Sequence, residues 1–117
     1  CFRSGYFYWI RRIVMYRLLL LIFFWPNLIF SAVFIDVRTA EEFETESIMN
    51  TQNIEWQNIL DIQTLVSKDE EIFLFCRSGK RSGKAKKILE AEGYNRVINI
   101  GGFEEAKEFI SAKGTNS

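Results

Sequence analysis

The stretch from residue 72 to residue 87 constrains the fold of this chain more than any other part of its sequence. It starts with the apolar run 72–75, continues with Cys76 and a short polar loop that contains Gly79, and then becomes helical in pattern. A strand, a short loop and a helix in this order are typical of α/β folds, in which ligands bind just beyond the carboxyl ends of the strands. Cys76 therefore stands where chemistry is expected.

The loop after Cys76 favours a thiolate. A helix that begins near residue 82 directs unpaired N–H groups and a partial positive charge at the loop, and the loop amides can form an anion-binding nest. Arg77, Lys80 and Arg81 add full positive charges. These features lower the pKa of a cysteine and would also attract an anionic substrate. The alternative interpretation is a buried apolar cysteine that merely ends a core strand, but the glycine, the three cations and the helix start together favour a functional site.

Charge is distributed unevenly along the 117 residues, whose number suits one domain with one core. The net charge of the whole chain is zero, yet the part from Asp36 onward holds all 15 acidic residues and only 11 of the 15 basic ones. An acidic body with one basic loop argues against nucleic acid as the partner, because binding to phosphate backbones requires a broad basic surface. The loop points to a small anion instead.

Cysteine and histidine counts narrow the possible chemistry. The chain has two cysteines, Cys1 and Cys76, and no histidine. This excludes a disulfide framework, a metal site built on histidine and a nucleophile activated by histidine. We therefore expect no metal and no cofactor, and we expect loop dipoles and cations to activate Cys76.

The first 32 residues resemble a leader rather than part of a folded domain. The chain starts with Cys1, so we interpret residues 1–14 as translated sequence upstream of a start at Met15. Residues 15–32 have a basic start, a short uncharged apolar stretch and a small-residue end, the pattern of a secretory signal peptide. This predicts a periplasmic or otherwise exported protein. The residues at the −3 position of the possible cleavage sites are bulky. An uncleaved membrane anchor formed by 15–32 is therefore an open alternative. We expect no other contact with a membrane.

From residue 33 onward the pattern alternates between strands and helices. Thr39 is a good helix N-cap, and Glu42 three residues later completes a capping box. Such alternation predicts a parallel sheet with helices on both faces. The expected strands are 33–37, 53–54, 72–76 and 97–100; the expected helices are 40–46, 56–66, 81–92 and 103–112; the domain is 33–112, and 113–117 is a polar tail.

Four short motifs follow one another along this body. They are Asp36-Val37-Arg38 with Glu42-Phe43, the loop from Cys76 to Ser82, Gly93-Tyr94 with Val97, and Gly101-Gly102-Phe103. In this order and spacing they resemble the single-domain rhodaneses, most of all the small periplasmic rhodaneses of the phage-shock type. The resemblance covers about residues 33–110. It implies a rhodanese-like three-layer sandwich, with a central, mostly parallel sheet between helices.

The resemblance also implies sulfur transfer. Cys76 would take the outer sulfur of thiosulfate or a similar small anionic donor as a persulfide, and a thiophilic acceptor such as cyanide or a thiol would then remove it. Asp36 and Arg38 would form a structural ion pair near the site, and Gly101 and Gly102 would let the neighbouring backbone pass close to the loop. The residues that would bind the donor or cradle the persulfide are Arg77, Ser78, Gly79, Lys80, Arg81 and Ser82.

Residues 47–55 depart from the family pattern. Where the family has histidine, a glycine–alanine step and proline, this chain has Ser47, Asn50-Thr51 and Glu55. The segment helps to shape one wall of the site in this family, so it leaves substrate preference and stability open.

Two other functions compete with sulfur transfer. Phosphatases and arsenate reductases of related fold need a Cys-x5-Arg loop, whereas Arg81 follows Cys76 in a Cys-x4-Arg spacing, which disfavours phosphate chemistry. A non-catalytic rhodanese-like module that binds a partner or carries sulfur is the second alternative, and the sequence leaves it open. A decayed reading frame is a third possibility, and the coherent pattern of strands and helices in residues 33–110 argues against it.

Overall fold

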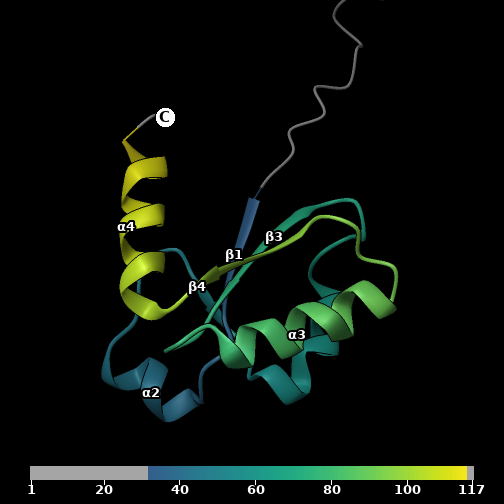
Figure 1. Ribbon diagram of the computed structural model, residues 1–117, viewed down its shortest axis with the longest axis horizontal. Coiled ribbons are helices and arrows are strands. Elements are labelled where there is room, and N and C mark those ends of the chain that lie inside the picture. The colour runs from purple at the N-terminus through teal and green to yellow at the C-terminus, as the bar shows by residue number, and fades with distance from the viewer. Residues whose placement is uncertain (1–31, 116–117) are drawn as a thin grey trace, which may run out of the picture.

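The computed structural model describes residues 32–115, so the predictions made for residues 1–31 lie outside this part. Strands and helices alternate along it (Figure 1). The elements in chain order are β1 (Ala32–Asp36), α2 (Ala40–Thr45), β2 (Gln52–Asn53), the 3₁₀ helix η1 (Trp56–Thr64), β3 (Glu71–Phe75), α3 (Lys80–Ala91), β4 (Val97–Gly101) and α4 (Phe103–Gly114).

The four strands form one parallel sheet in the order β2-β1-β3-β4. The pairing of β3 with β4 shifts by one residue near its carboxyl end: Leu74 lies opposite Asn99, and Phe75 lies opposite Gly101. Ile100 is therefore an extra residue on β4. Bulges of this kind re-aim side chains beside functional sites, and this one lies next to Cys76, at the edge where the strands end.

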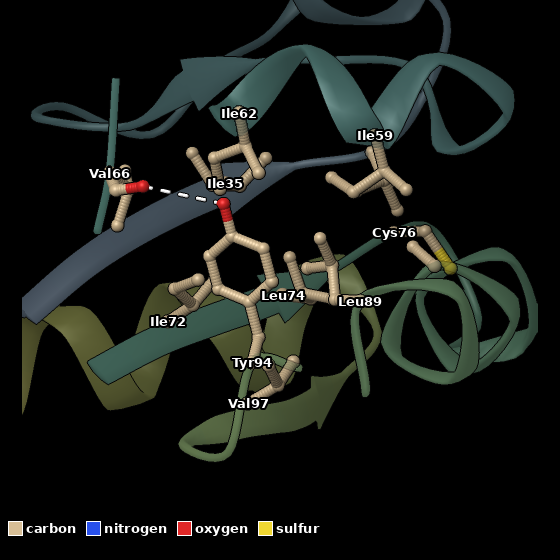
Figure 2. Packing of buried hydrophobic residues seen from close by; sticks show 12 residues of the cluster. Ile35, Ile59, Ile62, Val66, Ile72, Leu74, Cys76, Leu89, Tyr94 and Val97 are labelled. Atoms are coloured by element: carbon tan, nitrogen blue, oxygen red, sulfur yellow. Dashed lines mark hydrogen bonds between the residues drawn. The ribbon is translucent and has the colours of Figure 1, made fainter. Parts of the chain in front are cut away.

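Alternate residues of β3 pack on opposite faces of the sheet, which explains the three layers. Ile72, Leu74 and Cys76 belong to a buried cluster under α3 and η1, whereas Phe75 packs with residues of α4 on the other face. Figure 2 shows the first cluster, with the Tyr94 hydroxyl donating to the carbonyl of Val66 at 3.3 Å. The predicted parallel sheet with helices on both faces is confirmed.

The segment 56–66 differs from its prediction. It forms a 3₁₀ helix with a break at Asn58 rather than a regular α-helix. Ile59 and Ile62 are buried, three residues apart, as the period of a 3₁₀ helix requires. The spacing of the apolar residues in 56–66 also predicts that Leu60 and Leu65 lie on this inner face. That prediction is wrong, because their exposed fractions are 39% and 59%.

The helix ends also differ slightly from expectation. α3 begins at Lys80, one residue early. The sequence pattern places Ala91 on the face toward the sheet, but its side chain is exposed. α4 continues to Gly114, beyond the expected end at residue 112, and the Lys113 ammonium lies 4.2 Å from the centre of the Phe73 ring. That contact favours continuing the helix. Within residues 32–115, no helix has the length and apolar character needed to cross a bilayer.

Candidate active site

Cys76 lies directly after β3, at the carboxyl edge of the sheet, and its side chain is fully buried. Its backbone N–H donates to the Gly101 carbonyl at 3.2 Å, which ties the start of the loop to β4. The loop then turns at Gly79, whose φ of +90° lies in the left-handed region that favours glycine. This turn brings the Gly79 N–H to 3.0 Å from the Cys76 Sγ.

The sulfur occupies the position of a helix cap. Among the described residues, no side chain caps the N-terminus of α3, and the Ser82 hydroxyl on its first turn lies 3.5 Å from the sulfur. Burial raises the pKa of the Cys76 thiol, but hydrogen bonds from the Ser82 side chain and from the backbone N–H groups of Ser82, Ser78 and Gly79 outweigh it. The net pKa is below the ordinary thiol value, as expected for sulfur that accepts such bonds.

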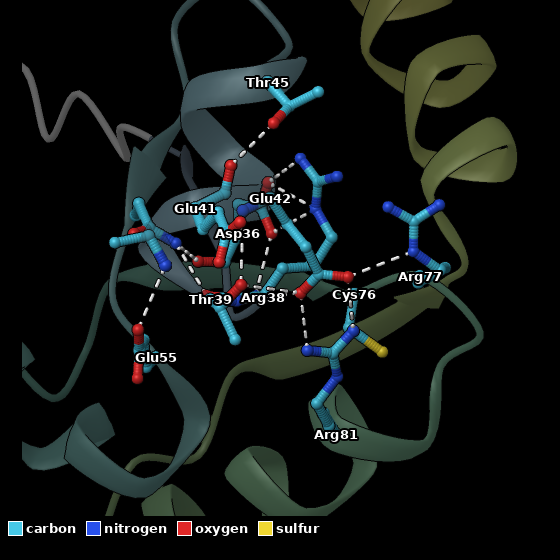
Figure 3. A network of polar contacts seen from close by, with 12 residues as sticks. Asp36, Arg38, Thr39, Glu41, Glu42, Thr45, Glu55, Cys76, Arg77 and Arg81 are labelled. Atoms are coloured by element: carbon cyan, nitrogen blue, oxygen red, sulfur yellow. Dashed lines mark hydrogen bonds and ion pairs between the residues drawn. The ribbon is translucent and has the colours of Figure 1, made fainter.

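Glu42 on α2 binds two of the three loop cations. Its carboxylate accepts from Arg77 Nε at 3.0 Å and from Arg81 Nη1 and Nη2 at 2.7 and 3.1 Å; Figure 3 shows both guanidinium groups directed at it. Bonding from Arg81 holds the pKa of Glu42 far below its ordinary value. Lys80 is exposed and has no ion-pair partner within residues 32–115. The cations are therefore partly neutralised where the sequence predicted free positive charge.

Gly102 brings the strand after the loop into backbone contact with it. Ser78 and Gly102 form an antiparallel bridge, and the Phe103 N–H donates to the Arg77 carbonyl at 3.4 Å. A Cβ at Gly102 would lie 2.8 Å from that carbonyl oxygen, which is too close for any other residue without a backbone shift. The backbone of residues 101–103 thus packs directly against the loop.

Residues 26–108 match the rhodanese-like domain family. The chain belongs to this family. It is 36% identical over 73 residues to the thiosulfate sulfurtransferase PspE of Escherichia coli K12, covering 61% of this chain and 70% of PspE. It is 32% identical over 68 residues to a sulfurtransferase of Allochromatium vinosum, covering 58% of this chain and 64% of that protein.

A solved structure agrees with this assignment. The structure described as a rhodanese with anions from E. coli is 30% identical, with a TM-score of 0.60, and the match covers 64% of this chain and 91% of that one. The predicted rhodanese-like fold is therefore confirmed. Several relatives are named sulfurtransferases, so the family assignment supports sulfur transfer in general.

The Asp36–Arg38 pair of this rhodanese-like domain packs on the face of the sheet that α4 covers, whereas Cys76 packs on the other face. Arg38 Nη2 donates to Asp36 Oδ2 at 2.7 Å, and both side chains are fully buried. The same nitrogen donates to the Glu46 carbonyl at 2.7 Å, and the guanidinium lies 4.2 Å from the centre of the Phe103 ring. The pair thus fixes the end of α2 against α4, on the face of the sheet opposite Cys76. Within residues 32–115, no His, Cys, Asp or Glu cluster suits a metal ion.

The segment 47–55 contacts other parts of the domain. Asn53 Nδ2 donates to the carbonyls of Asp36 and Arg38 at 3.0 and 2.9 Å. Residues 47–50 line a hollow of about 370 Å³ together with Lys107, Ile110 and Ser111 of α4. This part of the segment therefore faces α4, while Asn53 supports the end of β1.

Sequence reasoning missed two side chains of the site. Glu42 was assigned to the capping box and to a family motif but not to a contact with the loop; it does form the box, since its carboxylate accepts from the Thr39 N–H at 3.0 Å. Asn99 was not singled out, yet its side chain contacts Ser82, Gly79 and Gly101. Nothing in the sequence indicated that Glu42 would lie within reach of two loop arginines. For Asn99, the one indication was that a polar residue stands inside the otherwise apolar strand 97–100.

Proposed function

We propose that this rhodanese-like domain is a thiosulfate sulfurtransferase that works through a persulfide on Cys76. The observation that carries the proposal is the sulfur itself: it is buried, accepts the Gly79 N–H at 3.0 Å and has a lowered pKa. A thiolate held at a helix start is a suitable nucleophile for a sulfane sulfur.

The proposed reaction has two steps. In the first, the Cys76 thiolate attacks the outer sulfur of thiosulfate; a new S–S bond forms, the bond to the sulfonate sulfur breaks, and sulfite leaves with its electron pair. In the second, cyanide or a thiolate attacks the outer sulfur of the persulfide. The S–S bond to Cys76 breaks, thiocyanate or a new persulfide leaves, and the Cys76 thiolate is restored. The scheme predicts ping-pong kinetics.

The loop residues have distinct proposed roles. The N–H groups of Ser78, Gly79 and Ser82 bond to the Cys76 sulfur, and the N–H groups of residues 77–82 would cradle the outer sulfur of the persulfide. Lys80 would attract the anionic donor, because it is exposed and no carboxylate of residues 32–115 neutralises it. Arg77 and Arg81 would contribute through the guanidinium N–H groups that Glu42 does not bind.

We also propose that the protein is exported through residues 15–32, leaving the domain 33–112 in the periplasm or beyond it. The apolar stretch and its small-residue end support this proposal. Expression of the full chain in a bacterium, fractionation and intact mass of the recovered protein test it. A shortened protein in the periplasm is expected, whereas a full-length protein in the membrane fraction would favour the anchor.

Mass spectrometry tests the persulfide directly. The full-length protein is incubated with thiosulfate, desalted, digested without reductant and examined at the peptide that contains Cys76, which separates it from Cys1. A gain of about 32 Da on that peptide is expected, lost on addition of cyanide as thiocyanate appears. Cys76→Ser, shown by circular dichroism to be folded, is expected to gain nothing and to turn over no thiosulfate.

The opposite outcome has a definite meaning. A folded wild-type protein with a free Cys76 thiol that gains no sulfur would contradict the proposed enzyme. It would favour the non-catalytic rhodanese-like module, and full turnover by Cys76→Ser would contradict the assignment of Cys76.

A further inference from the structure

The Ser82 hydroxyl has one proton and three possible acceptors. Its oxygen lies 3.5 Å from Cys76 Sγ, 3.1 Å from the Gly79 carbonyl oxygen and 2.7 Å from Asn99 Oδ1. The Ser82 side chain is fully buried, so water does not supply a further partner. A hydroxyl donates only one hydrogen bond, and the shortest contact is the one to Asn99.

The Asn99 side chain is oriented by three contacts. Its Oδ1 accepts from the Gly101 N–H at 3.0 Å as well as from Ser82, and its Nδ2 donates to the Gly79 carbonyl at 3.1 Å. The Gly101 N–H can only donate and the Gly79 carbonyl can only accept, which fixes the orientation of the amide. Asn99 Oδ1 carries no hydrogen, so the 2.7 Å contact uses the proton of Ser82.

We infer that Asn99 is a positioning residue that governs the nucleophile by competing with Cys76 for the Ser82 proton. Asn99 Oδ1 holds the proton while the sulfur is a neutral thiol. As Cys76 loses its proton, the negative sulfur becomes the stronger acceptor, and the hydroxyl turns toward it. Turning breaks the 2.7 Å contact with Asn99, so ionisation of Cys76 gains less than it would from a hydroxyl with no competing acceptor. The pKa of Cys76 is therefore lowered less than Ser82 alone would lower it, and the thiolate is more nucleophilic.

Other charged groups surround the sulfur but are constant in the test below. Arg77, Lys80 and Arg81 lie in the loop and the first turn of α3, and Glu42 on α2 holds both arginines. Glu105 on α4 lies beside Gly102. The Asp36–Arg38 pair on the β1 side lies across the sheet, and β4 contributes the uncharged Asn99.

The test is a double-mutant cycle read by the pH dependence of Cys76 alkylation. The rate of reaction of the full-length protein with iodoacetamide is followed at the Cys76 peptide over the pH range of thiol ionisation. Asn99→Ala is expected to move the midpoint to lower pH by up to about one unit, the value of one hydrogen bond, because the nearer of the two acceptors that compete with the sulfur is removed and only the Gly79 carbonyl remains. Ser82→Ala is expected to move it to higher pH.

The double variant decides between action through Ser82 and a general effect on the loop. In the Ser82→Ala background, Asn99→Ala is expected to leave the midpoint unchanged, since no hydroxyl proton remains to compete for. An equal shift in both backgrounds, or a rise in the midpoint of Asn99→Ala alone, would overturn the inference. If Asn99→Ala does not fold, Asn99→Ser replaces it, because its shorter side chain also withdraws the acceptor.

This inference rests on the proposed function only in taking Cys76 as the nucleophile. Alkylation requires neither thiosulfate nor an acceptor, so the two can fail separately. A persulfide without the expected cycle would refute the role of Asn99 alone, whereas the expected cycle without a persulfide would refute the enzyme and leave the control of the thiolate standing.

Discussion

Helices α2 and α3 both begin at the edge of the sheet that carries the site, and their first turns are built in opposite ways. α2 starts with a full capping box between Thr39 and Glu42 and with acidic residues in its first turn. α3 starts at Lys80 after an N-cap, Gly79, in a left-handed conformation, and has Lys80 and Arg81 in its first turn. Acids at a helix start complement the macrodipole and cations oppose it, so only α2 follows the rule for stability.

The difference shows that the first turn of α3 is arranged for the site rather than for the stability of the helix. The N-terminus of α3 faces the Cys76 sulfur, which accepts the N–H of Gly79 and that of Ser82, the third residue of the helix, which a capping side chain would otherwise bind. Cations there favour an anionic sulfur and an anionic donor rather than the helix. Glu42 joins the two arrangements, because the same carboxylate caps α2 and binds Arg77 and Arg81.

Removing a cation from the start of α3 should cost substrate binding. Arg81→Ala is expected to raise the KM for thiosulfate about tenfold, on the order of 1 kcal/mol for a lost charge-assisted contact. Steady-state kinetics measure it. Lys87→Ala, which removes an exposed cation farther along the same helix, serves as the matched control and should leave the KM unchanged. An unaltered KM in Arg81→Ala would show that the guanidinium serves only Glu42.

Removing the cap of α2 should cost stability instead. Thr39→Ala is expected to lower the free energy of unfolding by about 1 kcal/mol, because the N-cap side chain that accepts from the Glu42 N–H is lost. Urea denaturation followed by circular dichroism measures it. Persulfide formation should continue at the wild-type rate, since both arginines keep Glu42. A large loss of activity at unchanged stability would erase the distinction between the two helices.

Reversing a charge at the start of α3 should improve the helix and impair the site. Lys80→Glu is expected to raise the free energy of unfolding by about 0.3–1 kcal/mol, because an acid then lies in the first turn, and to raise the KM for thiosulfate. The two values come from urea denaturation and kinetics on the same sample. Lys87→Glu is the control for the change in net charge. A variant that is both less stable and fully active would contradict this view of α3.

Local patterns in the sequence were sufficient for the fold class and for the place of Cys76. The apolar run of β3, the capping box of α2 and the glycine at the turn each depend on neighbours within a few residues, and such features can be recognised without the fold. The boundaries of α3 and α4 shifted by one or two residues, because helix ends depend on contacts such as that of Lys113 with Phe73.

The sequence by itself thus determined a parallel α/β sheet and a cationic loop after a strand-ending cysteine. Only the tertiary structure decided how that loop is balanced: Glu42 meets Arg81 across 39 positions of sequence, and Asn99 meets Ser82 across 17. The first contact depends on β1 lying next to β3, and the second on the pairing of β3 with β4, which shifts by one residue beside Asn99. The physical reason is that hydrophobic periodicity and secondary-structure propensity fix which way a residue faces on its own helix or strand. The register between elements then sets which partner that residue meets.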